Sequence, residues 1–250
     1  MLSAEERGRY ARQLALPGFG AAAQERLREG RVLVVGCGGL GSPALLYLAA
    51  AGVGRIGFVD SDLVDLSNLQ RQILHATTDI GRLKTDSAEA RLRALNPHLH
   101  LESYPLRLSP DNARQVFAPY DVVIDAADTY ATKYLVNDVC CSLRKPFVHA
   151  GVMGWCGQAM TVLPGQTACL RCIAPTPPAE PEPAARAILG TVPGLVGTLA
   201  ASEAIKLLTG LGTPLADRLL VYDALAASFL TFAAHPAPAC PACSHLRDSQ

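Results

Sequence analysis

The stretch around residue 36 restricts the fold of this chain more than any other part of its sequence. The run from Val32 to Val35 is apolar and valine-rich, which is typical of a buried parallel strand. A glycine-rich turn follows, and an apolar helical pattern begins directly after it. The glycines of this turn are Gly36, Gly38, Gly39 and Gly41. Such a turn lets a phosphate approach main-chain N–H groups at a helix N-terminus, so the pattern predicts a nucleotide-binding α/β fold and leaves the nucleotide open.

Length and charge exclude several classes of protein. A chain of 250 residues can form one large domain with a substantial core. Its 22 lysines and arginines balance 22 acidic residues, so no net field attracts nucleic acid or an anionic membrane. The start from Met1 to Tyr10 is polar, without a signal-peptide segment, and the longest apolar run, 43–53, is too short to cross a bilayer. We expect a cytoplasmic protein that binds neither nucleic acid nor a membrane.

Apolar periodicity predicts alternating strands and helices over much of the chain, which is typical of a Rossmann-like α/β fold. The expected strands are 32–35, 56–60, 99–104, 121–125 and 146–151, with later ones at 158–163, 219–223 and 227–232. The expected helices are 39–51, 84–96, a short one from Ser109, 131–143 and 194–208. Together they predict a mainly parallel sheet with helices on both faces and late antiparallel strands.

We expect a single domain over residues 1–250. Residues 1–30 would form a helical N-terminal arm, 31–151 the nucleotide-binding half and 152–250 a second half. The segment 173–193 is rich in proline and has few large apolar side chains, so it predicts a flexible loop inside the second half.

The eight cysteines fall into two groups. Those of the first group stand in apolar sequence and are expected to be small buried side chains. They are Cys37, Cys140, Cys141 and Cys156. The second group is Cys169-x-x-Cys172 and Cys240-x-x-Cys243. Without a secretory signal, two such pairs favour tetrahedral zinc over disulfides, and four thiolates leave no position for water, which predicts a structural clip. Two unrelated free or redox-active pairs are the alternative.

A charged segment after the second strand distinguishes this chain from a dehydrogenase. Asp60 ends that strand about twenty residues beyond the glycine turn, where a dinucleotide fold has the carboxylate that binds a ribose hydroxyl. Arg71 and Lys84 follow. Hydride transfer needs no such cations, whereas attack on a triphosphate must overcome negative charge on both reactants. We therefore expect Arg71 and Lys84 to neutralise phosphate charge.

Two acids follow the predicted strand 121–125. Asp125 and Asp128 would lie at the carboxyl end of the sheet, where α/β proteins bind their ligands. Carboxylate oxygens suit Mg²⁺, which usually takes one or two of them together with phosphate oxygens. We expect Asp128 to bind magnesium and Asp125 to hold the turn, with helix or turn capping as the alternative for each.

In this order the motifs resemble those of the HesA/MoeB/ThiF proteins, the bacterial relatives of ubiquitin-activating enzymes. The resemblance extends from about residue 5 to about residue 245, and its most specific part is the run Ser67-Asn-Leu-Gln-Arg71. The other matching motifs are the turn from Gly36 to Gly41, Asp60-Ser-Asp62, Lys84, Asp128, the two cysteine pairs, Arg9-Tyr-Ala-Arg12-Gln13 and Glu203-Ala-Ile-Lys206.

The resemblance implies a reaction and its partners. Family members use ATP and Mg²⁺ to adenylate the C-terminal glycine of a ubiquitin-like (β-grasp) sulfur-carrier protein with a Gly-Gly end, and they release pyrophosphate. It also implies a homodimer, a structural zinc ion and a carrier-binding role for the half 152–250. The molybdopterin synthase small subunit is the carrier we favour, with the thiamine sulfur carrier and a dedicated carrier as alternatives.

The resemblance also implies roles for single residues. Nucleotide contacts fall to Gly36, Gly38, Gly39, Gly41, Asp60, Asp62, Ser67, Asn68, Arg71, Lys84 and Asp128. Among these, Asp60 would bind the ribose, Gly39 and Ser67 the phosphates, and Asp128 magnesium. Asn68, Arg71 and Lys84 would act on the phosphates and the transition state. Arg12 would reach across the dimer into the partner's active site, so the expected catalytic residues are Arg12, Arg71, Lys84 and Asp128.

The chain departs from the family pattern in two ways. Thr129 stands where many members have asparagine, and Arg186 or a neighbouring alanine stands where a loop cysteine often lies. No cysteine occurs between Cys172 and Cys240, and no sulfurtransferase domain follows Cys243 in the sequence. We therefore expect an enzyme that stops at the acyl-adenylate. A nicotinamide-dependent oxidoreductase, which would leave the cations unexplained, and a non-catalytic partner-binding relative are the alternatives.

Overall fold

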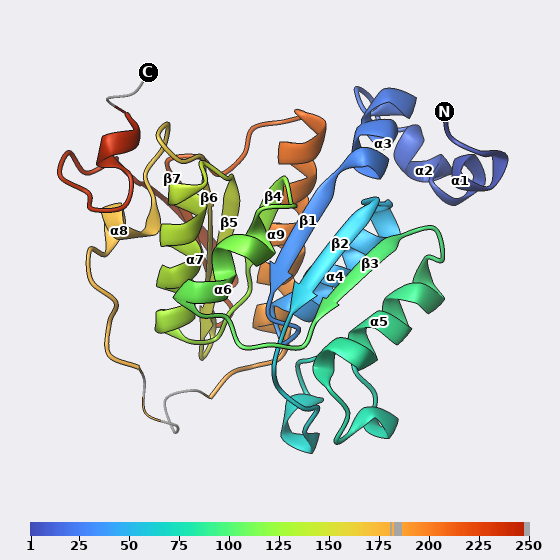
Figure 1. The fold of residues 1–250 in the computed structure, drawn as a ribbon, viewed down its shortest axis with the longest axis horizontal. Coiled ribbons are helices and arrows are strands. Elements are labelled where there is room, and N and C mark those ends of the chain that lie inside the picture. The colour runs from blue at the N-terminus through green and yellow to red at the C-terminus, as the bar shows by residue number, and fades with distance from the viewer. Residues whose placement is uncertain (181, 183–186, 248–250) are drawn as a thin grey trace.

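The computed structural model describes residues 1–180, 182 and 187–247. Within them the strands form one eight-stranded sheet in the order β3-β2-β1-β4-β5-β6-β7-β8 (Figure 1). The parallel strands are β1 (Arg31–Val35), β2 (Arg55–Val59), β3 (His100–Tyr104), β4 (Val122–Asp125) and β5 (Phe147–Met153). The antiparallel strands are β6 (Cys156–Val162), β7 (Arg218–Asp223) and β8 (Ser228–Ala233). The prediction of a mainly parallel sheet with late antiparallel strands is confirmed.

Helices cover both faces of the sheet, as predicted (Figure 1). One face carries α4 (Gly41–Ala51), α5 (Lys84–Leu95) and α9 (Thr191–Thr209), and the other carries α6 (Pro110–Phe117) and α7 (Tyr130–Ser142). Val32 and Val34 of β1 pack in the core beneath α4, together with Leu45. Leu33 points the other way and packs in the core that contains Phe117 of α6. Because successive side chains of a strand point to opposite faces, this one strand contributes to both cores.

The N-terminal arm consists of short helices that pack on the end of α4. They are α1 (Ala4–Arg9), α2 (Ala11–Leu14) and α3 (Gly20–Glu29). The side-chain amides of Gln13 and Gln24 donate to the Ala51 carbonyl at 3.1 and 2.8 Å. Asn96 Nδ2 donates to the Tyr10 hydroxyl at 2.9 Å. These bonds attach the arm to the ends of α4 and α5, so it is part of the folded body.

The predicted loop 173–193 ends earlier than expected. Helix α9 begins at Thr191, and the short helix α8 (Leu170–Ile173) takes the first residue of the segment. Pro193 lies in the first turn of α9, where proline is tolerated because an N–H there has no helical acceptor. Residues 181 and 183–186, including the predicted replacement of the family cysteine at Arg186, lie outside the described residues.

The prediction of buried cysteines in the first group is wrong for one of them. Cys37, Cys140 and Cys141 are buried, as expected. Cys156 is exposed, because it is the first residue of β6 and borders an open cavity. No helix in the described part of the chain is long and apolar enough to cross a membrane.

Candidate active site

A cavity of about 800 Å³ opens at the carboxyl ends of the parallel strands, and the glycine turn forms part of its wall. Gly36 has φ of +103°, and a Cβ there would lie 2.7 Å from the Ala126 carbonyl oxygen. A Cβ on Gly41 would lie 1.8 Å from the Gly36 carbonyl oxygen. Gly38 and Gly39 line the cavity, whereas Gly41 does not. Glycine is therefore required at 36 and 41 for the turn itself, and the loop exposes its backbone to the cavity at 38 and 39.

Asp60 lines the cavity directly after β2, as the ribose prediction requires. Its Oδ2 accepts from the Cys37 N–H at 2.8 Å, and its Oδ1 accepts from the Asp62 N–H at 2.9 Å. Burial raises the pKa of Asp60, and the nearby Lys84 ammonium opposes that shift. Asp60 therefore also orients the glycine turn, a role that its sequence position does not reveal.

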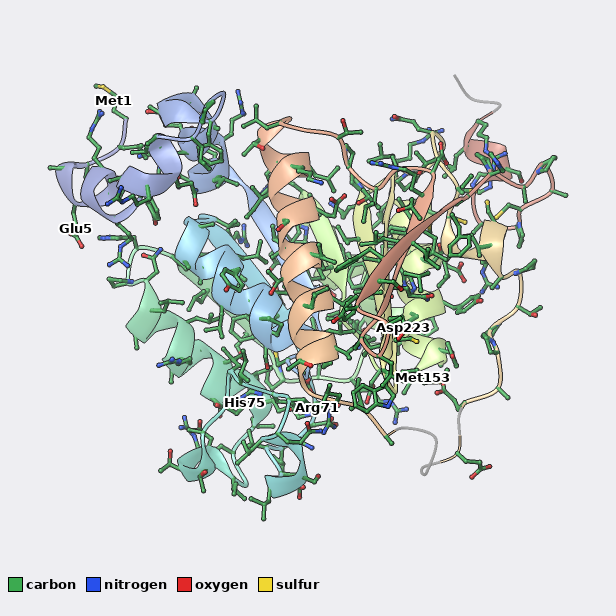
Figure 2. The ribbon with its side chains drawn as sticks, turned by 180° about the vertical axis from the view of Figure 1, so that it is seen from behind. Met1, Glu5, Arg71, His75, Met153 and Asp223 are labelled. Atoms are coloured by element: carbon green, nitrogen blue, oxygen red, sulfur yellow. The ribbon has the colours of Figure 1, made fainter. Side chains whose placement is uncertain are left out.

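The predicted cations Arg71 and Lys84 both border this cavity. Lys84, the first residue of α5, is buried, and its Nζ lies 2.7 Å from Asp62 Oδ2. Arg71 Nη1 donates to the Ser67 carbonyl at 3.1 Å, and Arg71, labelled in Figure 2, lines the cavity. An ammonium has three donors, so Lys84 keeps capacity for phosphate oxygens beyond the bond to Asp62.

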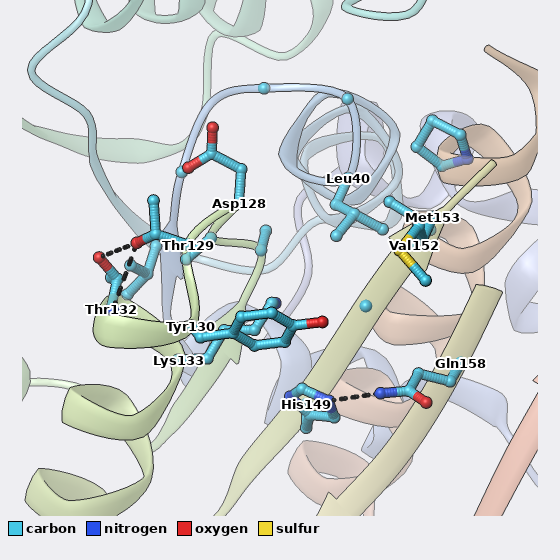
Figure 3. Close-up of a pocket in the computed structure, with 18 of the residues that line it drawn as sticks. Leu40, Asp128, Thr129, Tyr130, Thr132, Lys133, His149, Val152, Met153 and Gln158 are labelled. Carbon is cyan, nitrogen blue, oxygen red and sulfur yellow. Dashed lines mark hydrogen bonds between the residues drawn. The ribbon is translucent and has the colours of Figure 1, made fainter. Parts of the chain in front are cut away.

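Asp128 follows β4 and lines the cavity with an exposed carboxylate (Figure 3). Within the described ranges it takes part in no hydrogen bond or ion pair, so both of its oxygens are open to a cation. The neighbouring Thr129 caps α7 by accepting from the Thr132 N–H at 3.3 Å. Asp125 accepts from the Ala127 N–H at 3.2 Å and holds the turn, as expected. This donor set fits Mg²⁺, which prefers carboxylate oxygen and phosphate ligands.

A buried polar network beneath the cavity is the part of the site that the sequence did not reveal. Asp125 accepts from His149 Nδ1 at 2.8 Å and lies 3.4 Å from Lys133 Nζ. Burial works to raise the pKa of Asp125, but Lys133 and His149 hold it below its ordinary value. Burial lowers the pKa of His149, so its neutral Nε2 accepts from Gln158 Nε2 at 3.2 Å (Figure 3). The only signal in the sequence is a lone polar residue within the apolar run Phe147–Ala150.

Some predicted site residues do not line the cavity. Ser67 and Asn68 lie in the 3₁₀ turn Leu66–Asn68, and Ser67 Oγ donates to Asp65 at 2.5 Å. Arg12 is exposed on α2 and is not among the residues that line the cavity. Their contacts with a nucleotide, and a contact from Gly41, remain predictions.

The two cysteine pairs meet, as predicted. Sγ of Cys169 lies 3.8 Å from that of Cys172 and 3.5 Å from that of Cys240, and all four sulfurs lie within 4.8 Å of one another. A tetrahedral zinc ion with bonds of about 2.3 Å separates its sulfurs by about 3.8 Å, so the cluster has the right size. Arg247 Nη2 donates to Cys243 Sγ at 3.1 Å, which favours anionic sulfur. The residues fit a structural zinc ion.

Comparison with known proteins agrees with this picture. The fold and the cavity define a class of protein, the nucleotide-binding α/β proteins with cations around a glycine turn. The ThiF family model matches residues 10–242. A sulfur carrier protein adenylyltransferase from Thermus thermophilus is 47% identical over 247 residues, covering 96% of this chain and 91% of the relative. The SAMP-activating enzyme E1 of Haloferax volcanii is 44% identical over 245 residues, covering 97% and 90%.

Solved structures show the same fold. E. coli MccB, crystallised with ATP, superposes with a TM-score of 0.83 at 24% identity, over 94% of this chain and 74% of that one. The chain belongs to the ThiF family, which confirms the resemblance noted in its motifs. Its enzyme class is that of the adenylyltransferases, the class named for the Thermus relative.

Proposed function

We propose that this protein uses ATP to adenylate the C-terminal glycine of a ubiquitin-like sulfur-carrier protein and releases pyrophosphate. The observation that carries the proposal is the meeting of Arg71, Lys84 and Asp128 around a phosphate-binding glycine turn in one cavity. A cavity of this size has room for a nucleotide and for an extended peptide end beside it. The similarity to a sulfur carrier protein adenylyltransferase supports the choice of partner.

In the proposed reaction a carboxylate oxygen of the carrier's last residue forms a bond to the α-phosphorus. The bond from this phosphorus to the oxygen that bridges to the β-phosphate breaks, and pyrophosphate leaves with the electron pair. Both reactants are anions, so the chain's contribution is to hold them together and to neutralise charge. Lys84 and Arg71 supply cations, the glycine turn supplies N–H donors, and Asp60 binds the ribose. Magnesium held at Asp128 would neutralise further phosphate charge.

The expected homodimer explains where Arg12 would act. The residue is exposed on α2 and does not border the cavity of its own chain. A catalytic role for Arg12 therefore requires a second copy whose cavity it can reach. Mixing an Arg12→Ala chain with a Lys84→Ala chain tests this, because a mixed dimer would regain one intact site and part of the activity. Equal inactivity of the mixture and of the two separate variants would contradict a role across the dimer.

Among sulfur carriers we propose the molybdopterin synthase small subunit, with the thiamine sulfur carrier as the alternative. The support is the lack of a cysteine between Cys172 and Cys240, which fits an enzyme that stops at the acyl-adenylate. Detection of a covalent thioester or acyl-disulfide between enzyme and carrier would overturn that limit. Adenylation assayed against each purified carrier separates the two pathways.

The direct test is exchange of radiolabelled pyrophosphate into ATP, which requires reversal of the adenylation step. We expect exchange with the full-length carrier and none with the same carrier shortened by its last glycine. Exchange that is absent with every Gly-Gly carrier, in a preparation that binds ATP, would favour a non-catalytic partner-binding protein. Binding of a nicotinamide dinucleotide in place of ATP would favour the oxidoreductase alternative.

A further inference from the structure

The segment from Arg71 to His75 folds back on the glycine turn. Figure 2 labels Arg71 and His75 of this segment in the lower middle of the molecule. His75 Nε2 lies 3.0 Å from the Cys37 carbonyl oxygen inside the turn. Gln72 is buried and faces Gly38, where a Cβ would lie 3.6 Å from the Gln72 Nε2. The turn is therefore held from the side of this segment as well as by Asp60.

The bond from His75 has only one possible direction. A backbone carbonyl can only accept, so Nε2 of His75 carries the proton and donates it to Cys37. Burial lowers the pKa of His75, so the ring is neutral and its Nδ1 is an acceptor. Ser87 Oγ lies 2.8 Å from that Nδ1 and 2.9 Å from Asp79 Oδ2, and its single hydroxyl proton can be donated to only one of these two acceptors at a time. The imidazole thus lies between the Cys37 carbonyl and Ser87 and contacts both.

The two bonds to Cys37 determine where the next N–H points. Asp60 accepts the Cys37 N–H and His75 donates to the Cys37 carbonyl, so both peptide planes of this residue are fixed. In a trans peptide the carbonyl and the following N–H point in opposite directions. Because the Cys37 carbonyl points to His75, the Gly38 N–H points away from it. Gly38 lines the cavity, and in the described part of the chain its N–H has no acceptor.

The other end of the bridge is the helix that carries a catalytic cation. Ser87 and Lys84 both belong to α5 and are three residues apart, so they share one face of the helix. Lys84 reaches the cavity from the first turn of α5, and Ser87 contacts His75 from the next turn. The His75 side chain thus connects the glycine turn, whose N–H groups would bind the phosphates, to helix α5, which carries Lys84.

We propose that His75 is a positioning residue that sets the distance between the Gly38 N–H and the Lys84 ammonium, so that both meet the triphosphate together. The inference rests on the proposed use of ATP. His75 touches neither substrate, and its effect passes through the Cys37 peptide and through Ser87. Without its bond, the turn keeps its glycines and its Asp60 contact but gains freedom to rotate the donor away from the phosphates.

Two substitutions separate this role from simple packing. Glutamine has its amide nitrogen near the position of Nε2, so His75→Gln keeps a donor for the Cys37 carbonyl. Asparagine is shorter and has its polar atoms near the position of Nδ1. His75→Asn therefore keeps a contact with Ser87 and loses the hydrogen bond to the Cys37 carbonyl. We expect His75→Asn to weaken binding of α,β-methylene-ATP and to lower kcat/KM for ATP by about 10²-fold, the size of a small misplacement of reacting groups. His75→Gln should keep most of both.

The melting temperatures of the two variants decide between positioning and stability. Positioning predicts similar melting temperatures and different nucleotide affinities, with KM for the carrier unchanged. Equal affinities in both variants, or a loss of affinity that follows the loss of melting temperature, would overturn the proposal. Because the methylene analogue binds without reaction or carrier, these variants test His75 even if no carrier is adenylated. Failure of pyrophosphate exchange in the wild-type protein would instead count against the proposed function.

Discussion

The cavity and the cysteine cluster both gather side chains that can bind ions, but they leave different room around those side chains. Asp128 stands exposed in the cavity wall, and Lys84 has one carboxylate partner for its three donors. In the cluster, four sulfurs face one another within 4.8 Å, and only Cys172 among their residues is not fully buried. Open groups suit a substrate that comes and goes, whereas a closed set suits an ion that stays. Changes to the cavity should therefore alter activity, and changes to the cluster should alter stability.

The largest effect is expected for the closed cluster. Serine is a poor zinc ligand, so Cys243→Ser would release the zinc ion that we expect to join α8 to the C-terminal turn. Structural zinc supplies roughly 10 kcal/mol of apparent binding free energy in small domains, so the variant should lose most of the stability of its second half. Metal content together with denaturant unfolding measures this. Cys156→Ser is the matched control, because Cys156 is exposed and lies outside the cluster. Equal stability of the two variants would contradict the zinc clip.

Asp125 is expected to affect both stability and activity. It lies beneath the cavity and is fully buried between His149 and Lys133, both of which line the cavity. Asp125→Asn removes the charge that compensates the buried ammonium, which should destabilise the fold by about 3–5 kcal/mol and lower activity as well. Asp121→Asn is the control directly before the same strand, where the ion pair with Arg31 is exposed and worth about 1 kcal/mol or less. Similar unfolding free energies for both variants would show that the network is not needed for folding.

The open cavity should respond in activity alone. Lys84→Ala removes one cation from the transition state, and we expect pyrophosphate exchange to fall by about 10²–10³-fold, as for the loss of one such donor. Arg71→Ala should behave in the same way. Arg82→Ala is the control, because this exposed cation pairs with Asp79 and does not border the cavity. Normal exchange in both cavity variants would contradict adenylation at this site.

The sequence reveals those parts of the molecule whose geometry depends on residues that are close together in the chain. The glycine turn, the strand ends at Asp60 and Asp125 and the cysteine pairs are short patterns whose geometry depends on neighbouring residues. The contacts around the cavity depend on strand order, which is why His149 escaped prediction. It meets Asp125 only because β4 and β5 are adjacent in the sheet. The sequence does not reveal the role of Lys133 either, because a lysine one turn into a helix is usually solvated.

The same limit applies to the roles of the predicted site residues that the structure brings together at the cavity. Asp60 was expected at a ribose, and its sequence position cannot show that it also accepts from the Cys37 N–H. His75 lies only a few residues from Arg71, yet its function depends on which loop packs over it. Sequence patterns thus identify the groups that perform chemistry more readily than the groups that hold them in position.

The smallest effect is expected for a third kind of cluster, a half-buried group of hydrogen-bonded side chains at the β3 edge of the sheet. Glu102 of β3 accepts from the hydroxyls of Tyr104 and Tyr120 at 2.8 and 2.7 Å and pairs with Arg55. Burial tends to raise the pKa of Glu102, but these donors outweigh it and lower the pKa to about 2. A folded-state pKa below the unfolded value stabilises the fold above about pH 4.5, and this contribution is lost as the pH falls toward about 2.

Glu102→Gln measures that contribution directly. Solvent screening limits it, so we expect the variant to be less stable at pH 7 by only about 1 kcal/mol. The difference between wild type and variant should shrink as the pH falls from 4.5 to 2, because the wild-type carboxylate then becomes protonated. If the cysteine cluster holds zinc, its loss in acid would affect both proteins equally and cancel in the difference. A constant difference across this range would mean that the carboxylate charge does not stabilise the fold. If Glu102→Gln lowered the unfolding free energy as much as Cys243→Ser, hydrogen bonds within a closed group of side chains would explain the effect of both substitutions without a bound ion.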